Sequence, residues 1–365
     1  MPKKSILKSA TYLALYCCLM FIGTCHANLH VQEVEPQVLR GQWFYHWGDL
    51  PKNDTSGNWQ FSQGDWHQIE FPENLPNRNQ HNIVWVKINL PAGSWRDPYL
   101  FLSSVDLTFE TFHNGIRIHH FGDIDAHGQS DFEGWPWHII RLPNNYADHT
   151  LYFRIASDYP YIGLSGQASI GNRFTLLNDI YKNGLTGLSF ILVILLIGII
   201  STTMGIIKKD KMVAFSTGIL SFNLALMMFA ENELSQVVLF EPLVWRYIAA
   251  FSYFMVPAFL SIIILAWFKK SPPRIPRAVL AITLLFTCGV AVLSLFTSFN
   301  FVNAYPYFDV LFIVLVSALL AGCIQNFYKE GATGSLMLIG ILALFVSLIL
   351  DMLSAHGLIT WIGQT

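Results

Sequence analysis

Aromatic side chains beside basic residues, in two short stretches of the chain, could bind a sugar-like molecule. Flat rings stack on the apolar faces of sugars, while a guanidinium or imidazole can hydrogen-bond to hydroxyl or carboxylate groups. The stretches "FEGWPWHIIRLP" and "SDYPYIG" supply the candidates, which are Trp135, Trp137, His138, Arg141, Tyr159 and Tyr161. The same side chains could instead be core residues or loop anchors, and the sequence leaves that alternative open.

A second stretch, "HHFGDIDAH", has the side chains of a metal site but not the spacing. Imidazole and carboxylate groups suit Zn²⁺ and related ions. The candidate ligands are His119, His120, Asp123, Asp125 and His127. No compact helical spacing such as H-E-x-x-H occurs here, and a polar loop after a hairpin explains the residues equally well. We therefore predict no metal and no other cofactor, and keep these five residues as the alternative.

The sequence contains no motif for catalysis that we can recognise. It lacks a G-x-S-x-G nucleophile elbow and a P-loop pattern. Of the five cysteines, Cys17, Cys18 and Cys25 lie near the N-terminus, and Cys288 and Cys323 lie in apolar segments. The sequence thus predicts that the chain is not an enzyme and has no disulfide framework. Any output enzyme, such as a diguanylate cyclase or kinase, would lie beyond residue 365.

Six long apolar blocks in the second half of the sequence predict an all-α membrane bundle. Only 13% of the residues are charged, against roughly 25% in soluble domains, and each block is close to the length that crosses a bilayer. The predicted spans are residues 185–207, 212–230, 243–268, 278–297, 307–327 and 335–355. Because the net charge is only −2, nothing indicates nucleic-acid binding.

Loop charges and the N-terminus predict the orientation of these spans. Residues 1–27 combine Lys3, Lys4 and Lys8 with a short apolar run that ends in "CHA", as in a signal peptide. Alternate loops between spans are basic, through Lys208, Lys209 and Lys211 and then Lys269, Lys270, Arg274 and Arg277. By the positive-inside rule these loops are cytoplasmic. We therefore expect a multi-pass protein of the bacterial inner membrane, with its N-terminal domain in the periplasm and residues 356–365 as an outer tail.

Ionisable residues near the outer ends of the spans form a candidate coupling layer. Charged groups are costly within a bilayer, so their positions are informative. The residues are Glu231, Glu233, Arg246, Asp309, Asp351 and His356. They could be solvated at the membrane interface, or they could lie beneath the exported domain and bias the bundle between two states.

Residues 28–175 are predicted to be an exported all-β domain of the jelly-roll or β-sandwich type, followed by a linker at 176–184. The run "NIVWVKINL" alternates in polarity, and "YLFLSSV" and "HTLYFRIAS" are rich in strand-forming residues. In "LTFETFHNGIRIHHFG", Asn114-Gly115 separates two such runs and predicts a tight hairpin. Several short strands with turn signals between them are typical of a sandwich.

The order of these segments resembles a known family. The succession of "GQWFYHWGDL", "GDWHQIEFP", "NIVWVKINLP" and "HNGIRIHHFGD" resembles a galactose-binding-type jelly roll. Joined to "NDIYKNGLTGLSFILVILLIGIISTTMGIIKKDK" and "LVWRYIAAFSYFMVPAFL", it resembles the bacterial seven-transmembrane receptors with diverse intracellular signalling modules. The resemblance implies a periplasmic sensor, a seven-helix bundle and a cytoplasmic output. This chain departs from it, because "HGLITWIGQT" is similar to the outer loop before a seventh helix and the sequence stops there, so we expect it to end before the seventh helix.

Together these features predict a membrane signal-transduction receptor. The exported sandwich would bind a small polar, carbohydrate-like ligand, and the bundle would relay occupancy to a cytoplasmic partner or output domain. The alternative is a carbohydrate-binding module tethered to a transporter-like or structural bundle. The expected partners are the lipid bilayer and a small-molecule or glycan ligand.

Overall fold

The computed structural model describes residues 35–53, 57–73, 75–93, 95, 97–125, 128–159, 162–207, 211–268, 273–297, 299–330, 338–343, 345–347 and 350. Several predictions fall outside these residues. They are the signal peptide at 1–27, the basic loop at Lys208 and Lys209, the candidate residues Tyr161, His127, Asp351 and His356, the outer tail at 356–365, and much of the span at 335–355.

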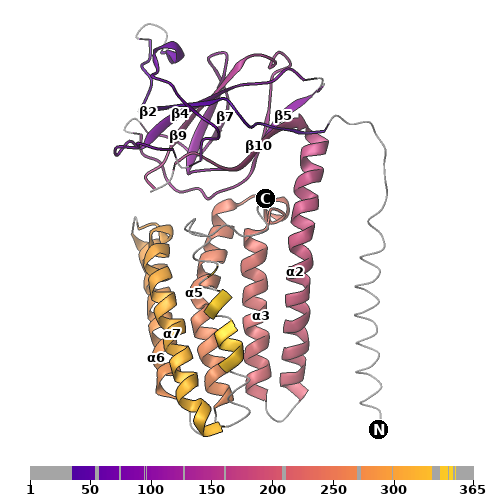
Figure 1. Ribbon diagram of the computed structural model, residues 1–365, viewed down its shortest axis with the longest axis vertical. Coiled ribbons are helices and arrows are strands. Elements are labelled where there is room, and N and C mark those ends of the chain that lie inside the picture. Colours follow the sequence, from indigo (N-terminus) through magenta and orange to yellow (C-terminus); the bar gives the residue numbers. More distant parts are fainter. Residues whose placement is uncertain are drawn as a thin grey trace. The chain divides into compact units, whose positions relative to one another are not determined.

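Two antiparallel sheets make up the first part of the described chain (Figure 1). The four-stranded sheet has the order β1 (Gln37–Val38), β10 (Leu164–Asn172), β5 (Pro98–Val105), β8 (His138–Arg141). The six-stranded sheet has the order β3 (His67–Ile69), β2 (Trp43–Trp47), β4 (Ile83–Asn89), β9 (Thr150–Ala156), β6 (Thr108–His113), β7 (Ile116–Phe121). A short 3-10 helix, η1 (Phe61–Gln63), lies between β2 and β3.

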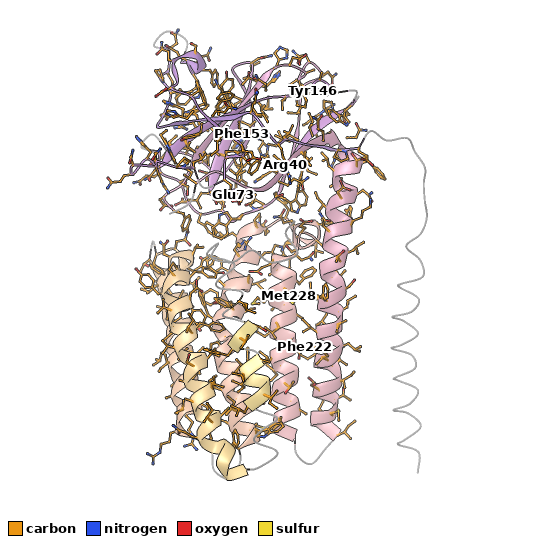
Figure 2. The ribbon with its side chains drawn as sticks, in the orientation of Figure 1. Arg40, Glu73, Tyr146, Phe153, Phe222 and Met228 are labelled. Atoms are coloured by element: carbon orange, nitrogen blue, oxygen red, sulfur yellow. The ribbon has the colours of Figure 1, made fainter. Side chains whose placement is uncertain are left out.

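The core lies between the two sheets, so the domain is a β-sandwich, as expected. Alternate residues of β4, including Val84 and Val86, are buried with Leu100 and Leu102 of β5 in one apolar cluster. Phe153 of β9 is fully buried in the same cluster (Figure 2). The period-2 pattern of the strands therefore selects the inner face. The finer jelly-roll assignment stays a prediction.

The hairpin predicted at Asn114-Gly115 is confirmed. It joins β6 to β7, and both turn residues have positive φ, 49° for Asn114 and 79° for Gly115. A two-residue turn with both φ values positive matches the right-handed twist of the flanking strands, and asparagine and glycine adopt it at the least steric cost.

Long apolar helices make up the second part of the described chain. They are α2 (Arg173–Ile207), α3 (Lys211–Glu231), α5 (Pro242–Trp267), α6 (Arg274–Phe296) and α7 (Tyr305–Glu330), with short α4 (Ser235–Val238) and η2 (Phe301–Ala304) between them. Five segments within the described residues are long and apolar enough to cross a membrane. The sixth predicted span is represented only by the shorter apolar helix Leu338–Ser347.

The helix α5 is the most enclosed of the five. In its most apolar window 61% of the residues are buried, against 17% for α2. It packs against α3, α6 and α7, whereas α2 packs mainly against α3. Small residues permit the α2–α3 contact, because a side chain at Gly198 or Gly218 would meet Ser221, Phe222 or Thr202. Close packing over small residues is a common way for membrane helices to associate.

The predicted linker at 176–184 is part of α2, which begins directly after β10. Leu176 and Ile180 are buried against Phe101 of the four-stranded sheet, while Asn178 and Asp179 are exposed. The spacing of four residues places the two apolar side chains on one helical face. Hydropathy alone misses this segment because its other face is polar.

Candidate ligand-binding and coupling site

The segment leading into β8 brings Trp135 and Trp137 against the turn that follows α3 and the start of α5. The indole N–H of Trp137 donates a hydrogen bond of 3.0 Å to the backbone carbonyl of Glu233. The guanidinium carbon of Arg246 lies 5.0 Å from the ring centroid of Trp135, within the range of a cation–π contact. Residues predicted for ligand binding, Trp135 and Trp137, therefore contact residues predicted for coupling, Glu233 and Arg246.

These residues line a hollow of about 130 Å³. Its walls are Ser103, Trp135 and Trp137 from the sandwich, with Ala230, Glu231, Asn232, Glu233, Ser235, Gln236, Pro242, Trp245 and Arg246 from the helical part. Asn232 fixes the turn, because its amide accepts from the Leu234 N–H at 2.9 Å and donates to the carbonyl of Gly184 at 3.1 Å. Glu231 and Glu233 lie on either side of Asn232 in the sequence.

Polar groups in the hollow are only partly satisfied. Among the described residues, Nε1 of Trp135, Oε2 of Glu233 and Oε1 of Gln236 are buried without a hydrogen-bond partner. Burial raises the pKa of the Glu233 carboxyl, as expected for a carboxylate removed from water. Such groups are costly unless water or a ligand pairs with them.

An aromatic contact adjoins the hollow and anchors the sandwich to η2. The Phe132 ring lies 5.0 Å from that of Trp135 and 5.9 Å from that of Phe301, edge to face in both cases. The ring of Tyr247 lies 4.1 Å from that of Phe301. Gly134, at φ 98°, permits the approach, since a Cβ there would come within 3.0 Å of the Pro242 backbone. Edge-to-face rings of this kind form tight apolar contacts.

Not all the predicted binding residues join this site. Tyr159 does, with its ring 6.0 Å from that of Trp135. His138 follows Trp137 in sequence and so points to the opposite face of β8, where it packs between the sheets 4.7 Å from the Phe109 ring. Arg141 is exposed and pairs with Asp97 at 3.2 Å. Alternation along one strand thus separates residues that are neighbours in the sequence.

The predicted coupling residue Asp309 lies in α7. Its carboxylate accepts a hydrogen bond of 2.9 Å from the hydroxyl of Tyr253 in α5. The Tyr253 ring in turn stacks near Tyr305 of α7, with centroids 6.1 Å apart. This polar link therefore joins α5, the helix that carries Arg246, to α7.

The residues of "HHFGDIDAH" that the structure describes do not converge on a point. His119 lies between the sheets, near His138, and His120 is exposed. Asp123 and Asp125 line a separate hollow of about 410 Å³ with Asp131 and Asp158. Across the described ranges, no group of three or more histidine, cysteine or acidic side chains could hold a metal ion.

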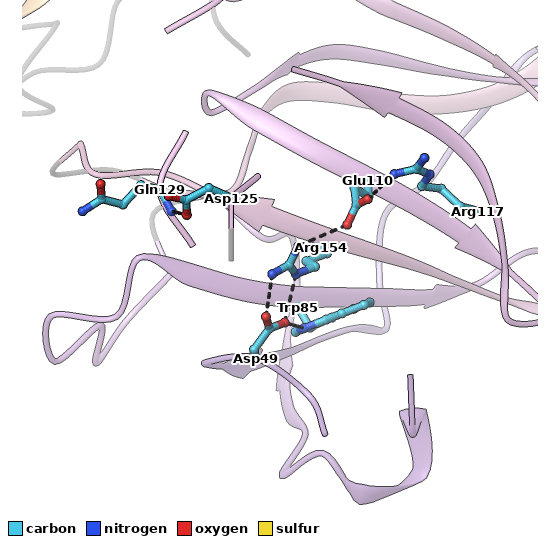
Figure 3. Close-up of polar contacts among 7 residues, drawn as sticks. All are labelled: Asp49, Trp85, Glu110, Arg117, Asp125, Gln129 and Arg154. Atoms are coloured by element: carbon cyan, nitrogen blue, oxygen red, sulfur yellow. Dashed lines mark hydrogen bonds and ion pairs between the residues drawn. The ribbon is translucent and has the colours of Figure 1, made fainter. Parts of the chain in front are cut away.

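An ion cluster on the outer face of the six-stranded sheet was not anticipated (Figure 3). Arg154 donates to both carboxylate oxygens of Asp49, at 2.9 and 2.5 Å, and to Glu110 at 3.2 Å. Arg117 also donates to Glu110, at 2.6 Å, and the Trp85 indole donates to Asp49 at 2.9 Å. The cluster fixes the segment after β2 onto the sheet. The arginine within the apolar run "LYFRIA" was its one sequence signal.

No protein-family model and no curated protein matches the chain. Solved structures similar to it include a glycosyl hydrolase family 2 member from Bacteroides cellulosilyticus, at 13% identity and a TM-score of 0.28 over 38% of this chain and 20% of that one. A β-glucuronidase from Ruminococcus gnavus in complex with uronic isofagomine matches at 12% identity and a TM-score of 0.31, over 39% and 29%. A GH2 β-galacturonidase from Eisenbergiella tayi, bound to galacturonate, matches at 11% and 0.28, over 40% and 26%.

The chain thus spans less than a third of the length of each of these enzymes. Likenesses at this level of identity and TM-score assign no function. The class of protein that the described residues define is a β-sandwich followed by a helical region with five candidate membrane spans.

Proposed function

We propose that this protein is a signal-transduction receptor of the bacterial inner membrane. Its exported sandwich binds a small polar, carbohydrate-like ligand, and its helices relay occupancy to a cytoplasmic partner or output domain. The chain itself performs no catalysis. The basic loops and the N-terminal signal pattern support the export of the sandwich.

The observation that carries this proposal is the shared wall of the 130 Å³ hollow. Trp135 and Trp137 come from the sandwich, while Glu233 and Arg246 come from the helical part. A ligand that contacts the two indoles would therefore also contact the α3–α5 connection. A ligand shifts a conformational equilibrium only through differential contacts with the two states. A ligand held by walls from both parts would have such contacts if the parts move relative to one another.

The relay can continue through α5. Arg246 lies one turn from the start of α5, and Tyr253 follows two turns later on the same helix. The hydroxyl of Tyr253 donates to Asp309 of α7. A ligand that displaces Arg246 would thus move α5, which is hydrogen-bonded to α7.

Hydrogen exchange of the full chain in lipid nanodiscs tests the relay. Monosaccharides are first screened by thermal shift, and exchange is then compared with and without a sugar that binds. A receptor should change exchange in the sandwich near 128–138 and also in the helical segments 231–246 and 301–309. Arg246→Ala should keep the first change and lose the second.

The alternative, a binding module on a structural bundle, gives a different pattern. Protection from hydrogen exchange by the sugar would then be confined to the sandwich. Arg246→Ala would not alter the response of the helical segments, because they would show none. Arg277→Ala, at an exposed basic residue of α6 that does not line the hollow, provides a matched control for loss of a charged side chain.

A further inference from the structure

The ionisable side chains that line the hollow carry surplus negative charge. They are the acids Glu231 and Glu233 and the base Arg246, so two carboxyl groups accompany one guanidinium, and Glu231 is exposed while Glu233 is partly buried. Arg246 stands over the Trp135 ring. Coulomb interactions are stronger in a partly desolvated hollow than in water. The hollow should therefore favour a positively charged ligand and disfavour an anionic one.

The hydrogen-bond donors and acceptors of the hollow belong to different residues. Trp135 offers an N–H donor, and Arg246 offers guanidinium donors; Glu233 and Gln236 each offer a buried acceptor without a partner among the described residues. A protonated amine has only donors, and it suits a carboxylate beside an amide oxygen. Hydroxyl groups suit the Trp135 and Arg246 donors.

We propose that the hollow binds an amino sugar or a similar amine-bearing polyol, with its protonated amine against Glu233 and Gln236 and its hydroxyl groups toward Arg246 and Trp135. This proposal rests on the proposed function and specifies the charge of the ligand. The volume of about 130 Å³ is close to that of the roughly 150 Å³ cavity that accommodates benzene in an engineered protein. One six-membered ring is therefore the largest group that the hollow would admit, with its substituents at the mouth.

The environment of Glu233 supports the same conclusion. Burial disfavours its charged form, and a cationic ligand would restore that form. Binding of the amine should then strengthen as the pH rises through the pKa of the Glu233 carboxyl, until the amine itself loses its proton.

The test measures binding of matched probes to the full chain in nanodiscs by calorimetry. The probes are glucosamine, glucose, glucuronate and ethanolamine, at about pH 6.5, where an aliphatic amine is mostly protonated. Glucosamine should bind about tenfold or more tightly than glucose, the effect of one charge-assisted contact, and glucuronate should bind most weakly of the sugars.

Three variants separate charge from structure. Glu233→Gln should abolish the preference for glucosamine over glucose, and Gln236→Glu should increase it. Glu241→Gln, at an exposed carboxylate of the same connection that does not line the hollow, should leave the preference unchanged. The Gln236→Glu variant keeps the test informative if Glu233→Gln weakens folding.

The outcomes distinguish this proposal from the proposed function. Equal binding of glucose and glucosamine would overturn the assignment of charge and leave sugar sensing intact. Binding of ethanolamine without any sugar would support the amine site and overturn the carbohydrate ligand. If no probe binds, the hollow is a water site and this inference is wrong.

Discussion

The indole Nε1 of Trp137 and the backbone carbonyl oxygen of Glu233 lie 3.0 Å apart, joining residues 96 positions apart in the chain. Trp137 precedes β8, and Glu233 belongs to the turn after α3. Because the acceptor is a main-chain atom, the bond depends on the position of the turn and not on the Glu233 side chain. The contact therefore reports directly on how the sandwich and the α3–α4 turn are placed.

Trp137→Phe should remove this bond and keep most of the ring packing. We expect a loss of about 1 kcal/mol in the free energy of unfolding, the usual net value of a neutral hydrogen bond. Trp66→Phe is the control, since its indole donates locally to the Phe61 carbonyl at 3.2 Å and the residue does not line the hollow. Thermal melts in detergent measure the stability of both variants. In hydrogen exchange, only the Trp137 variant should weaken the change that a bound ligand causes in residues 231–246. Equal responses in both variants would contradict the coupling role.

Arg154→Met should be far more damaging than Arg141→Met. The Arg154 side chain is only 9% exposed and pairs with Asp49 and Glu110, whereas that of Arg141 is 71% exposed. Removing one partner from a buried cluster leaves uncompensated carboxylates and costs about 3–5 kcal/mol; an exposed pair contributes about 0–1 kcal/mol. Urea unfolding of the two variants should show this difference. A loss below about 1 kcal/mol for Arg154→Met would show that the cluster is not a structural clamp.

Two histidines between the sheets should make the sandwich sensitive to acid. Burial, and next the charge of His119, lowers the pKa of His138 to about 3. Burial, and next the charge of His120, lowers the pKa of His119 to about 4. A depressed folded-state pKa means that the unfolded chain binds more protons below about pH 6.5, so stability falls as the pH drops from there toward 4. For His138 the loss is roughly 3 kcal/mol by about pH 4. His138→Leu should flatten this slope in pH-dependent melts, and an unchanged slope would count against it.

Asp106 should act in the opposite direction. Burial, and next the charge of Glu73, raises the pKa of its carboxyl to about 6, in spite of nearby Arg78. The folded state then holds a proton that the unfolded state releases above about pH 4, so this residue lowers stability as the pH rises toward 6. At about pH 7, Asp106→Asn should melt at a higher temperature than the native protein. At about pH 4 this advantage should be smaller. The matched variant Asp97→Asn, at an exposed carboxylate, should have no such advantage.

An isolated sandwich should need the first turns of α2. A fragment of residues 35–183 retains Leu176 and Ile180 on Phe101, whereas a fragment ending at Arg173 exposes that surface. Burying a leucine or isoleucine contributes about 1.5–3 kcal/mol. Both fragments should give β-type circular dichroism, with the longer one melting at a higher temperature. A helical spectrum, or identical melts, would contradict this view of the junction.

Local patterns in the sequence predicted the local structure well. Alternation in "NIVWVKINL" predicted β4 and its inner face, and Asn114-Gly115 predicted the hairpin turn, because both signals depend only on neighbouring residues. Five apolar blocks correspond to α2, α3, α5, α6 and α7. Hydropathy missed the start of α2 because only Leu176 and Ile180 on that turn are apolar and buried.

The site could be anticipated only in parts. Trp135, Trp137, Glu233 and Arg246 were each named, but nothing in their spacing shows that they meet, since the contact depends on tertiary packing. His138 and Arg141 were grouped with the tryptophans by proximity in sequence. Neighbouring side chains of a strand point to opposite faces, so His138 does not lie with the tryptophans at the site, and Arg141 pairs with Asp97 instead. Asp49 and Arg154 are far apart in the chain and gave no joint signal.

The direct succession of β10 and α2 has a mechanical consequence. No loop absorbs rotation between Asn172 and Arg173, and Leu176 and Ile180 hold the first turns of the helix against the sheet. A helix of 35 residues is about 50 Å long. Used as a lever, it would convert a tilt of about 5° at the sheet into a displacement of about 4 Å at Ile207. A motion too small to disturb the packing of the sandwich would then be large at the far end of the helix.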